Sequence, residues 1–214
     1  MLIIKHNPKI KNRLSHIPRL ESEHLILEEL QLADAPYVFK FAGSEEVAKT
    51  VVWDAHRNID HSLEYIAQIK LKLSNKPGSI FLSWGVRSKL DGAIFGLVSL
   101  TQFEKSCIQI GYVFHYGRWD SLLPLEALRS IIDYAVHSFP DIERIQARCF
   151  SSNVFSVRLM ERLAMDTEEV KVITIKVRGK SRDLNSYSLS PSHWKKVRLQ
   201  SFADDITKSN AANK

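Results

Sequence analysis

Three strand-like segments follow one another between residues 80 and 115, and they constrain the fold more than any other feature of the sequence. Apolar residues dominate Ile80 to Val86, Ala93 to Thr101 and Cys107 to His115. Two short segments with turn-forming residues, Lys89–Gly92 and Glu104–Ser106, separate them. Connections this short join antiparallel neighbours. The sequence therefore predicts an antiparallel meander.

Helix patterns flank this meander. Leu122 to Phe139 carries an apolar stripe at helical spacing, and Pro140 ends it. Strands that are first grouped and then alternate with helices indicate a mixed sheet flanked by helices. The other predicted elements are a strand over His24–Leu30, a helix over Asp34–Phe41, a helix over His61–Leu73 capped by Asp60, a strand over Arg144–Phe150, a helix over Val154–Leu163, and strands over Val170–Val177 and Leu184–Leu189.

The chain of 214 residues has room for one domain with appendages. Its 44% hydrophobic and 25% charged residues exclude disorder for the body of the chain. We expect a folded domain over residues 19–195 and a polar C-terminal tail over residues 196–214 that frays beyond Trp194. The longest apolar run, Ala93 to Leu100, is too short to cross a membrane.

The net charge of +6 is concentrated at the N-terminus. Residues 1–18 form a basic N-terminal extension with Lys5, Lys9, Lys11 and Arg13 and no acidic residue, and the rest of the chain is nearly neutral. A basic tail can contact nucleic acid or an anionic membrane. A solvated extension is the simpler interpretation, so we expect neither as a partner.

Metal and disulfide sites are not expected. Cys107 and Cys149 provide neither a disulfide framework nor a metal quartet, and no two histidines are spaced four residues apart. The low cysteine content is typical of a reducing compartment, so we expect a cytoplasmic protein. Gly-x-x-x-x-Gly-Lys and Gly-x-Ser-x-Gly motifs are absent from the sequence.

A series of short motifs between Leu20 and Trp194 resembles the GNAT acetyltransferase superfamily, in the branch of ribosomal-protein N-terminal-alanine acetyltransferases. The order and spacing of the motifs carry the resemblance. They are Glu21–Glu28, Ser44–Val47, Ile110–Tyr112, Trp119 with Glu126–Leu128, Asn153 and Ser156 with Glu161–Leu163, Gly179 with Arg182 and Asp183, and Tyr187–Leu189 with Trp194.

The resemblance implies an α+β fold with a mostly antiparallel, twisted sheet of about seven strands flanked by helices. It implies an N-acetyltransferase that moves an acetyl group from acetyl-CoA, without a metal, to the primary amine of a peptide N-terminus or a small molecule. Such a protein is a monomer or a homodimer. The chemistry needs hydrogen-bond donors for the thioester oxygen, a proton donor for the thiolate, and backbone N–H groups for the pyrophosphate.

Cofactor-binding residues follow from the same resemblance. The backbone N–H groups of Val113 and Phe114, at a splay between two strands, would hold the thioester carbonyl, and Asn153 would contact the cofactor. Ser156 would lie near the sulfur as a proton donor. The loop before the long helix would bind the pyrophosphate through Trp119, Ser121, Leu122 and Leu123.

Catalytic and acceptor residues are also implied. Ser156, Gln109 and Tyr112 are the catalytic candidates; Gln109 replaces a common glutamate, so it can orient an amine or water but cannot act as a base. Tyr112 can instead be a packing residue. Candidate acceptor-binding residues are Glu23, Trp53 and His56, although Glu23 equally fits a solvated charge at a strand edge.

The pyrophosphate loop departs from the family pattern and is degenerate in this respect. Leu122 stands where glycine is expected, and leucine tolerates positive φ poorly. Pro124 replaces a small residue and lacks an N–H group. Asp120 or Ser121 can cap the helix and occupy donors that a phosphate would use. Ala164 likewise stands where the family has glycine after the later helix.

Three functions therefore remain open. The first is an N-acetyltransferase with an atypical cofactor loop. The second is a non-catalytic relative that keeps the fold as a binding module for a protein or another acyl ligand. The third is a ribosome- or RNA-associated protein that uses its basic tail.

Overall fold

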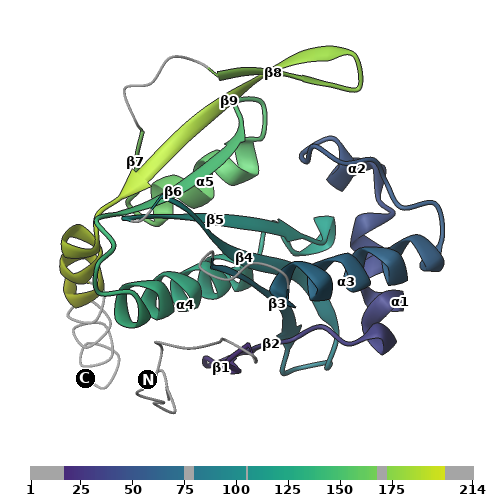
Figure 1. Ribbon diagram of the computed structural model, residues 1–214, viewed down its shortest axis with the longest axis horizontal. Coiled ribbons are helices and arrows are strands. Elements are labelled where there is room, and N and C mark those ends of the chain that lie inside the picture. Colours follow the sequence, from purple (N-terminus) through teal and green to yellow (C-terminus); the bar gives the residue numbers. More distant parts are fainter. Residues whose placement is uncertain (1–16, 75–79, 105, 168–172, 201–214) are drawn as a thin grey trace, which may run out of the picture.

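The computed structural model describes residues 17–74, 80–104, 106–167 and 173–200, and one twisted sheet forms its centre (Figure 1). Nine strands make up the sheet in this part of the chain. They are β1 (Leu20–Glu21), β2 (Leu25–Glu28), β3 (Phe81–Ser88), β4 (Ile94–Glu104), β5 (Cys107–Phe114), β6 (Arg144–Phe150), β7 (Asp166–Thr167), β8 (Ile173–Val177) and β9 (Lys180–Leu189).

Helices connect and cover these strands. The α-helices are α1 (Ala35–Ala42), α2 (Glu45–Ala48), α3 (Ile59–Ser74), α4 (Leu123–Ser138) and α5 (Val154–Arg162), and the 3₁₀ turns are η1 (Leu32–Asp34) and η2 (Tyr116–Arg118). Residues 191–200 form a further helical segment.

The sheet order is β1-β2-β3-β4-β5-β6-β9-β7, with β8 on β9. The predicted meander is confirmed, because β3, β4 and β5 pair antiparallel in succession. The α+β class and the mostly antiparallel sheet are confirmed as well. The sheet has more than the expected seven or so strands, since two-residue strands such as β1 and β7 are too short to leave a pattern in the sequence.

One parallel pair interrupts the antiparallel order. The helix α4 connects β5 to β6, which run parallel, but only the first half of β5 pairs with β6. The register ends at Ile110 opposite Ala147, after which β6 remains paired only with β9. The two strands therefore splay apart, and the second half of β5 has a free edge toward β6.

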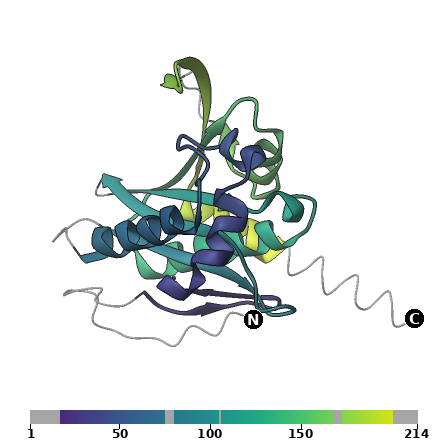
Figure 2. The same cartoon turned by 90° about the vertical axis from the view of Figure 1, so that its right-hand side faces the viewer.

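Two apolar layers hold helices on the two faces of the sheet. The stripe of α4 is buried against one face, together with residues of α5 such as Leu159 and Met160. On the other face, Val38 and Phe41 of α1 and Ile66 of α3 form a second buried cluster. The helices α1 and α3 lie side by side (Figures 1 and 2).

Three local predictions need correction. Asn58, not Asp60, accepts the hydrogen bond from the His61 N–H group at the start of α3. Fraying beyond Trp194 is also wrong as far as residue 200, because the helical segment 191–200 runs through Trp194, whose indole N–H donates to Asp133. The short helix α2 was not predicted as a helix; Ser44 caps it.

The strands β8 and β9 form a hairpin that projects from the sheet (Figure 1). Its turn lies at Arg178–Gly179, and both residues have positive φ, 51° and 73°. The strand β9 begins at Lys180 instead of Leu184. Residues 170–172 of the predicted strand before the turn lie outside the described residues.

Of the predicted N-terminal extension, residues 1–16 lie outside the described residues. Ile17 is buried, and the Pro18 carbonyl accepts a hydrogen bond of 2.7 Å from the Trp84 indole. Among the described residues, no helix has the length and apolar character required to span a membrane. The same residues contain no cluster of three or more histidine, cysteine or acidic side chains suited to a metal ion.

Candidate functional site

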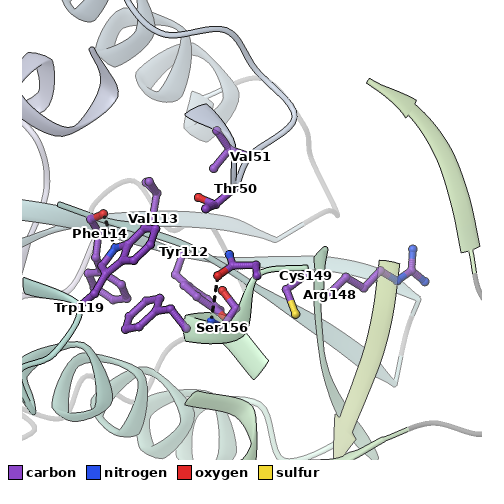
Figure 3. A pocket seen from close by; sticks show the side chains of 11 residues that line it. Thr50, Val51, Tyr112, Val113, Phe114, Trp119, Arg148, Cys149 and Ser156 are labelled. Carbon is purple, nitrogen blue, oxygen red and sulfur yellow. Dashed lines mark hydrogen bonds between the residues drawn. The ribbon is translucent and has the colours of Figure 1, made fainter. Parts of the chain in front are cut away.

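A narrow cavity of about 50 Å³ opens where β5 and β6 splay apart (Figure 3). Strands, helix termini and the loop after α2 all contribute to its wall. The lining residues are Thr50, Val51, Tyr112, Val113, Phe114, Trp119, Arg148, Cys149, Asn153, Phe155 and Ser156.

Backbone groups of β5 face the opening. The His115 N–H group donates to the Phe95 carbonyl of β4 over 2.7 Å. Because such bonds alternate along an antiparallel pair, the Val113 amide points to β4, and those of Tyr112 and Phe114 point toward the splay. The Val113 side chain still lines the cavity. The amides offered to a ligand are therefore those of Tyr112 and Phe114.

The first turn of α5 positions Ser156 at the cavity. Asn153 is the N-cap of α5, and its side-chain oxygen accepts a hydrogen bond of 3.1 Å from the Ser156 N–H group. The cap fixes the start of the helix, so the small Ser156 side chain is directed into the cavity (Figure 3). Ser156 is only 3% exposed.

The side chain of Tyr112 reaches from β5 toward Ser156 in the first turn of α5 (Figure 3). Its hydroxyl is enclosed, yet it makes no hydrogen bond of ordinary geometry within the described part of the chain. Burial is the main cause that raises the pKa of Tyr112, and the nearby Ser156 hydroxyl opposes this rise. The phenol therefore stays protonated at neutral pH. A buried donor without a partner suits a site that receives a polar ligand atom.

Trp119 closes the cavity on the side of α4. Its ring stacks on Phe155 with centroids 4.9 Å apart and planes 6° apart. Its indole N–H donates to the Phe114 carbonyl over 3.1 Å. Trp119 thus joins the loop before α4 to the start of α5, across the opening between the strands.

The loop before α4 keeps the N-terminus of this helix open. Leu122, the N-cap residue, has φ −79° and a 63% exposed side chain, so it neither needs a left-handed backbone nor fills the site. No side chain caps the helix: Ser121 donates its hydroxyl to the Arg118 carbonyl. Pro124 lies in the first turn, and Leu123 packs against the core.

Several sequence candidates lie away from this cavity. Gln109 is on β5 opposite Thr101 and Gln146 and does not line the cavity. Glu23 is exposed in the turn between β1 and β2, 3.7 Å from the His24 imidazole. Neither side chain is brought to Tyr112 and Ser156.

Trp53 and His56 belong to an aromatic cluster beside the cavity. The His56 ring lies 5.4 Å from Trp53 and 5.3 Å from Tyr65, and its Nδ1 atom is 2.8 Å from the Ser62 hydroxyl. Burial, followed by the neighbouring His61, lowers the pKa of His56. The cluster supports the loop that carries Thr50 and Val51, but its rings do not line the cavity.

Sequence reasoning missed five lining residues: Thr50, Val51, Arg148, Cys149 and Phe155. Thr50 and Val51 follow the Ser44–Val47 motif, which is the one signal that marks them. The others flank Asn153, which the motif did identify. Arg148 extends away from Ser156 at the rim of the cavity (Figure 3), and burial raises the pKa of the Cys149 thiol to about 11.

Curated proteins and solved structures resemble this chain over most of its length. This chain is 23% identical over 175 residues to the uncharacterized N-acetyltransferase YoaA of Bacillus subtilis. The aligned residues cover 80% of this chain and 96% of that protein. The uncharacterized N-acetyltransferase p20 of Bacillus licheniformis is 24% identical over 79% of this chain and 94% of its own length.

Solved structures agree with the fold. The microcin self-immunity acetyltransferase MccE, solved in complex with acetyl-CoA and AMP, superposes with a TM-score of 0.69 at 22% identity over 79% of this chain and 93% of that one. The ribosomal-protein-S5-alanine acetyltransferase of Vibrio fischeri gives 0.66 at 18% identity, over 82% and 98% respectively.

The family profile described as acetyltransferase (GNAT) domain matches residues 24–166. This range contains the meander, the parallel crossover through α4, the splay between β5 and β6, and the α5 N-terminus with Asn153 and Ser156. More than half of the chain is therefore matched, and the match includes every element that forms the cavity. The chain belongs to the GNAT family of acetyltransferases.

Proposed function

We propose that this protein is an N-acetyltransferase that transfers the acetyl group of acetyl-CoA to a primary amine, on a peptide N-terminus or a small molecule. One observation carries the proposal. The splay between β5 and β6 brings together outward-facing strand amides, an enclosed and unpartnered tyrosine hydroxyl, a buried serine and an uncapped helix N-terminus. Together they match the donors that acetyl transfer requires.

The chain's own groups fit acetyl-CoA, which supplies an activated acetyl thioester. The amides of Tyr112 and Phe114 would hold the thioester arm, as strand backbone holds an added strand. The first turn of α4 provides N–H groups and the positive end of the helix dipole for a diphosphate. Since no side chain occupies that helix end, the replacement of glycine by Leu122 leaves it usable.

Tyr112 and Ser156 are the proposed proton donors. Both residues line the cavity, and the raised pKa of Tyr112 keeps its proton available at neutral pH. Either group can protonate the thiolate that leaves when the amine attacks. No carboxylate or imidazole lines the cavity among the described residues, so the amine must arrive neutral. The cation of Arg148 at the rim disfavours an ammonium ion and thereby supports this state.

A second candidate function is a binding module that has lost acetyl-CoA. The observation that favours it is the Trp119–Phe155 stack, because the stack and the bond to the Phe114 carbonyl leave a cavity of only about 50 Å³. Under the transferase proposal Trp119 moves aside when acetyl-CoA binds. Under the alternative it does not.

Thermal melting with acetyl-CoA, followed by a thiol-release assay with amine acceptors, separates the two functions. At a concentration tens of times the Kd, acetyl-CoA should stabilise the fold by roughly 2 kcal/mol. Desulfo-CoA should give a comparable shift but no thiol release. An unchanged melting temperature at millimolar acetyl-CoA would favour the binding module and contradict the transferase proposal.

A further inference from the structure

A second and larger cavity, of about 190 Å³, lies between the β8–β9 hairpin, the end of β6 and the loop after α2. Four of its six lining residues carry a positive charge, and no acidic residue lines it in the described part of the chain. The lining residues are Lys49, Phe150, Val177, Arg178, Lys180 and Arg182. We call it the basic pocket.

The wall of the basic pocket is held in place by Arg178. Its guanidinium donates to the carbonyls of Ala48, Val51 and Trp53 and pairs with Asp54 at 2.7 Å. The hairpin is thereby fastened to the loop after α2. Because the Arg178 guanidinium donates its hydrogen bonds to carbonyl groups of the chain itself, the role of Arg178 here is to shape the pocket.

Arg182 forms the floor with Phe150. The guanidinium lies 4.7 Å from the centre of the Phe150 ring and donates to the Lys49 carbonyl over 2.8 Å. Phe150 is 3% exposed, so this surface is fixed and apolar beneath its charge. A guanidinium ordered in this way keeps donors in one place for an incoming anion.

Lys49 and Lys180 supply the remaining charge. Within the ranges that the structure describes, neither ammonium group lies in an ion pair with a carboxylate. Hydrogen bonds from its own backbone N–H group and from Ser44 are the main causes that lower the pKa of Glu46, and Lys49 adds a smaller coulombic contribution. Like charges that converge on one pocket repel one another, and an anion between them removes that repulsion. The pocket is thus charged in the manner of an anion site.

The basic pocket adjoins the cavity between β5 and β6. Lys49 precedes Thr50 and Val51 of the cavity wall, and Phe150 follows Arg148 and Cys149 of the same wall. Both cavities therefore share the loop after α2 and the end of β6. A molecule whose amine lies in the cavity between β5 and β6 therefore has the basic pocket next to it, on the side of the β8–β9 hairpin.

We infer that the acceptor is a primary amine that carries an anionic group, a carboxylate or a phosphate, and that the basic pocket binds this group through Lys49, Lys180 and Arg182. The inference rests on the proposed function, since it names the acceptor class of that site. The same residues repel an acetyl acceptor that carries a positive charge where the anionic group would lie.

Direct binding tests the inference without relying on catalysis. The probes are peptides labelled at the C-terminus that share an N-terminal alanine and differ only in the next two residues, which are Asp, Asn or Lys. We expect the acidic peptide to bind about tenfold more tightly than the neutral one. The basic peptide should bind most weakly, and the preference should shrink with added salt.

Matched variants identify the residues that cause the preference for the acidic peptide. In Lys49→Gln/Lys180→Gln the preference for the acidic peptide over the neutral one should fall to the small part that Arg182 alone supports, and each single variant should lose less of it. Lys176→Gln on the opposite face of the same hairpin is the control and should retain the preference in full. Unchanged melting temperatures would show that the variants remain folded.

A comparison of small molecules distinguishes a phosphate from a carboxylate as the bound anionic group. Thiol release is compared for 2-aminoethyl phosphate and ethanolamine, and for the acidic and neutral peptides, with KM measured for each. Charge-dependent binding without any thiol release would support the anion site and contradict the transferase proposal. Equal binding of all three peptides would overturn the inference. So would a preference that survives undiminished in the double variant, or a double variant that weakens the binding of acetyl-CoA instead of the binding of the acceptor.

Discussion

Ser156 and Tyr112 are the residues on which the proposed chemistry depends most. Ser156 is buried in the first turn of α5, and the Tyr112 hydroxyl is enclosed without a partner in the described part of the chain. Their backbone positions are fixed by other groups, the Asn153 cap and the β4–β5 ladder. The two side chains can therefore be altered without disturbing the local fold.

Replacing Ser156 by alanine removes one of the two proposed proton donors. We expect Ser156→Ala to lower kcat by roughly tenfold to hundredfold with little change in KM, because general acid catalysis is worth about this much or more. Steady-state thiol release measures the effect. The exposed Ser152→Ala, just before the helix, is the control. A kcat equal to that of the unmodified protein in both Ser156→Ala and Tyr112→Phe would exclude the two groups as donors.

Cys149 lines the cavity but should not take part in the transfer. Burial raises the pKa of its thiol to about 11, so at pH 8 only roughly 0.1% of it is thiolate. We expect Cys149→Ala to retain kcat and a thiol reagent to leave Cys149 unmodified in the folded protein. Because the pKa is raised on folding, Cys149 should lower stability only above about pH 9, where the unfolded thiol ionises first. An acetylated Cys149 in a quenched reaction would contradict direct transfer.

The sequence predicted the site best where the family resemblance assigns a role to a single residue. Asn153, Ser156, Tyr112 and Trp119 were named and all line the cavity. Thr50 and Arg148 were missed because loop and strand residues from distant segments meet only through the topology. Gln109 was named from its place in a motif, yet it lies in the half of β5 that is still paired with β6, before the strands splay apart.

At the scale of elements, the turn after α5 shows a cost of departing from the family pattern. Ala164 has φ 53°, a left-handed conformation in which its Cβ atom is strained. The Met165 N–H group donates to the Met160 carbonyl over 3.0 Å and closes the turn.

We expect Ala164→Gly to raise the free energy of unfolding by about 1 kcal/mol, because glycine adopts this backbone without strain. Denaturant unfolding measures the change. The control Ala67→Gly, within α3, should lower the free energy of unfolding by about the same amount. A loss of stability in Ala164→Gly as well would mean that the left-handed turn is not formed.

Substitutions in the first turn of α4 test whether this helix end binds the ligand. Pro124→Ala restores an N–H group to the helix end, and Leu122→Gly removes a side chain beside it. Pro124→Ala should bind acetyl-CoA several-fold more tightly in calorimetric titration. Leu122→Gly should change the affinity little, because the exposed Leu122 side chain does not fill the site. Leu90→Gly, at a 90% exposed position outside the site, is the control. Unchanged affinity in Pro124→Ala would show that the diphosphate does not bind at this helix end.

At the scale of the whole molecule, the fold class followed from periodicity, since long amphipathic segments such as α4 and the meander β3–β5 carry strong patterns. Helix α2 did not, because four residues held by a serine cap have no period to read. The splay between β5 and β6 was expected from the resemblance alone. Its extent depends on where pairing stops, at Ile110, and no local signal marks that residue.

Hydrogen exchange with and without acetyl-CoA tests the central claim most directly, that the splay and the open end of α4 receive acetyl-CoA. Saturating acetyl-CoA should slow amide exchange in residues 111–114, 119–125 and 153–157 together, and leave β1 to β3 unchanged. Those three segments surround the cavity between β5 and β6. Unaltered exchange in all three at millimolar acetyl-CoA, or protection confined to the β8–β9 hairpin, would contradict the account.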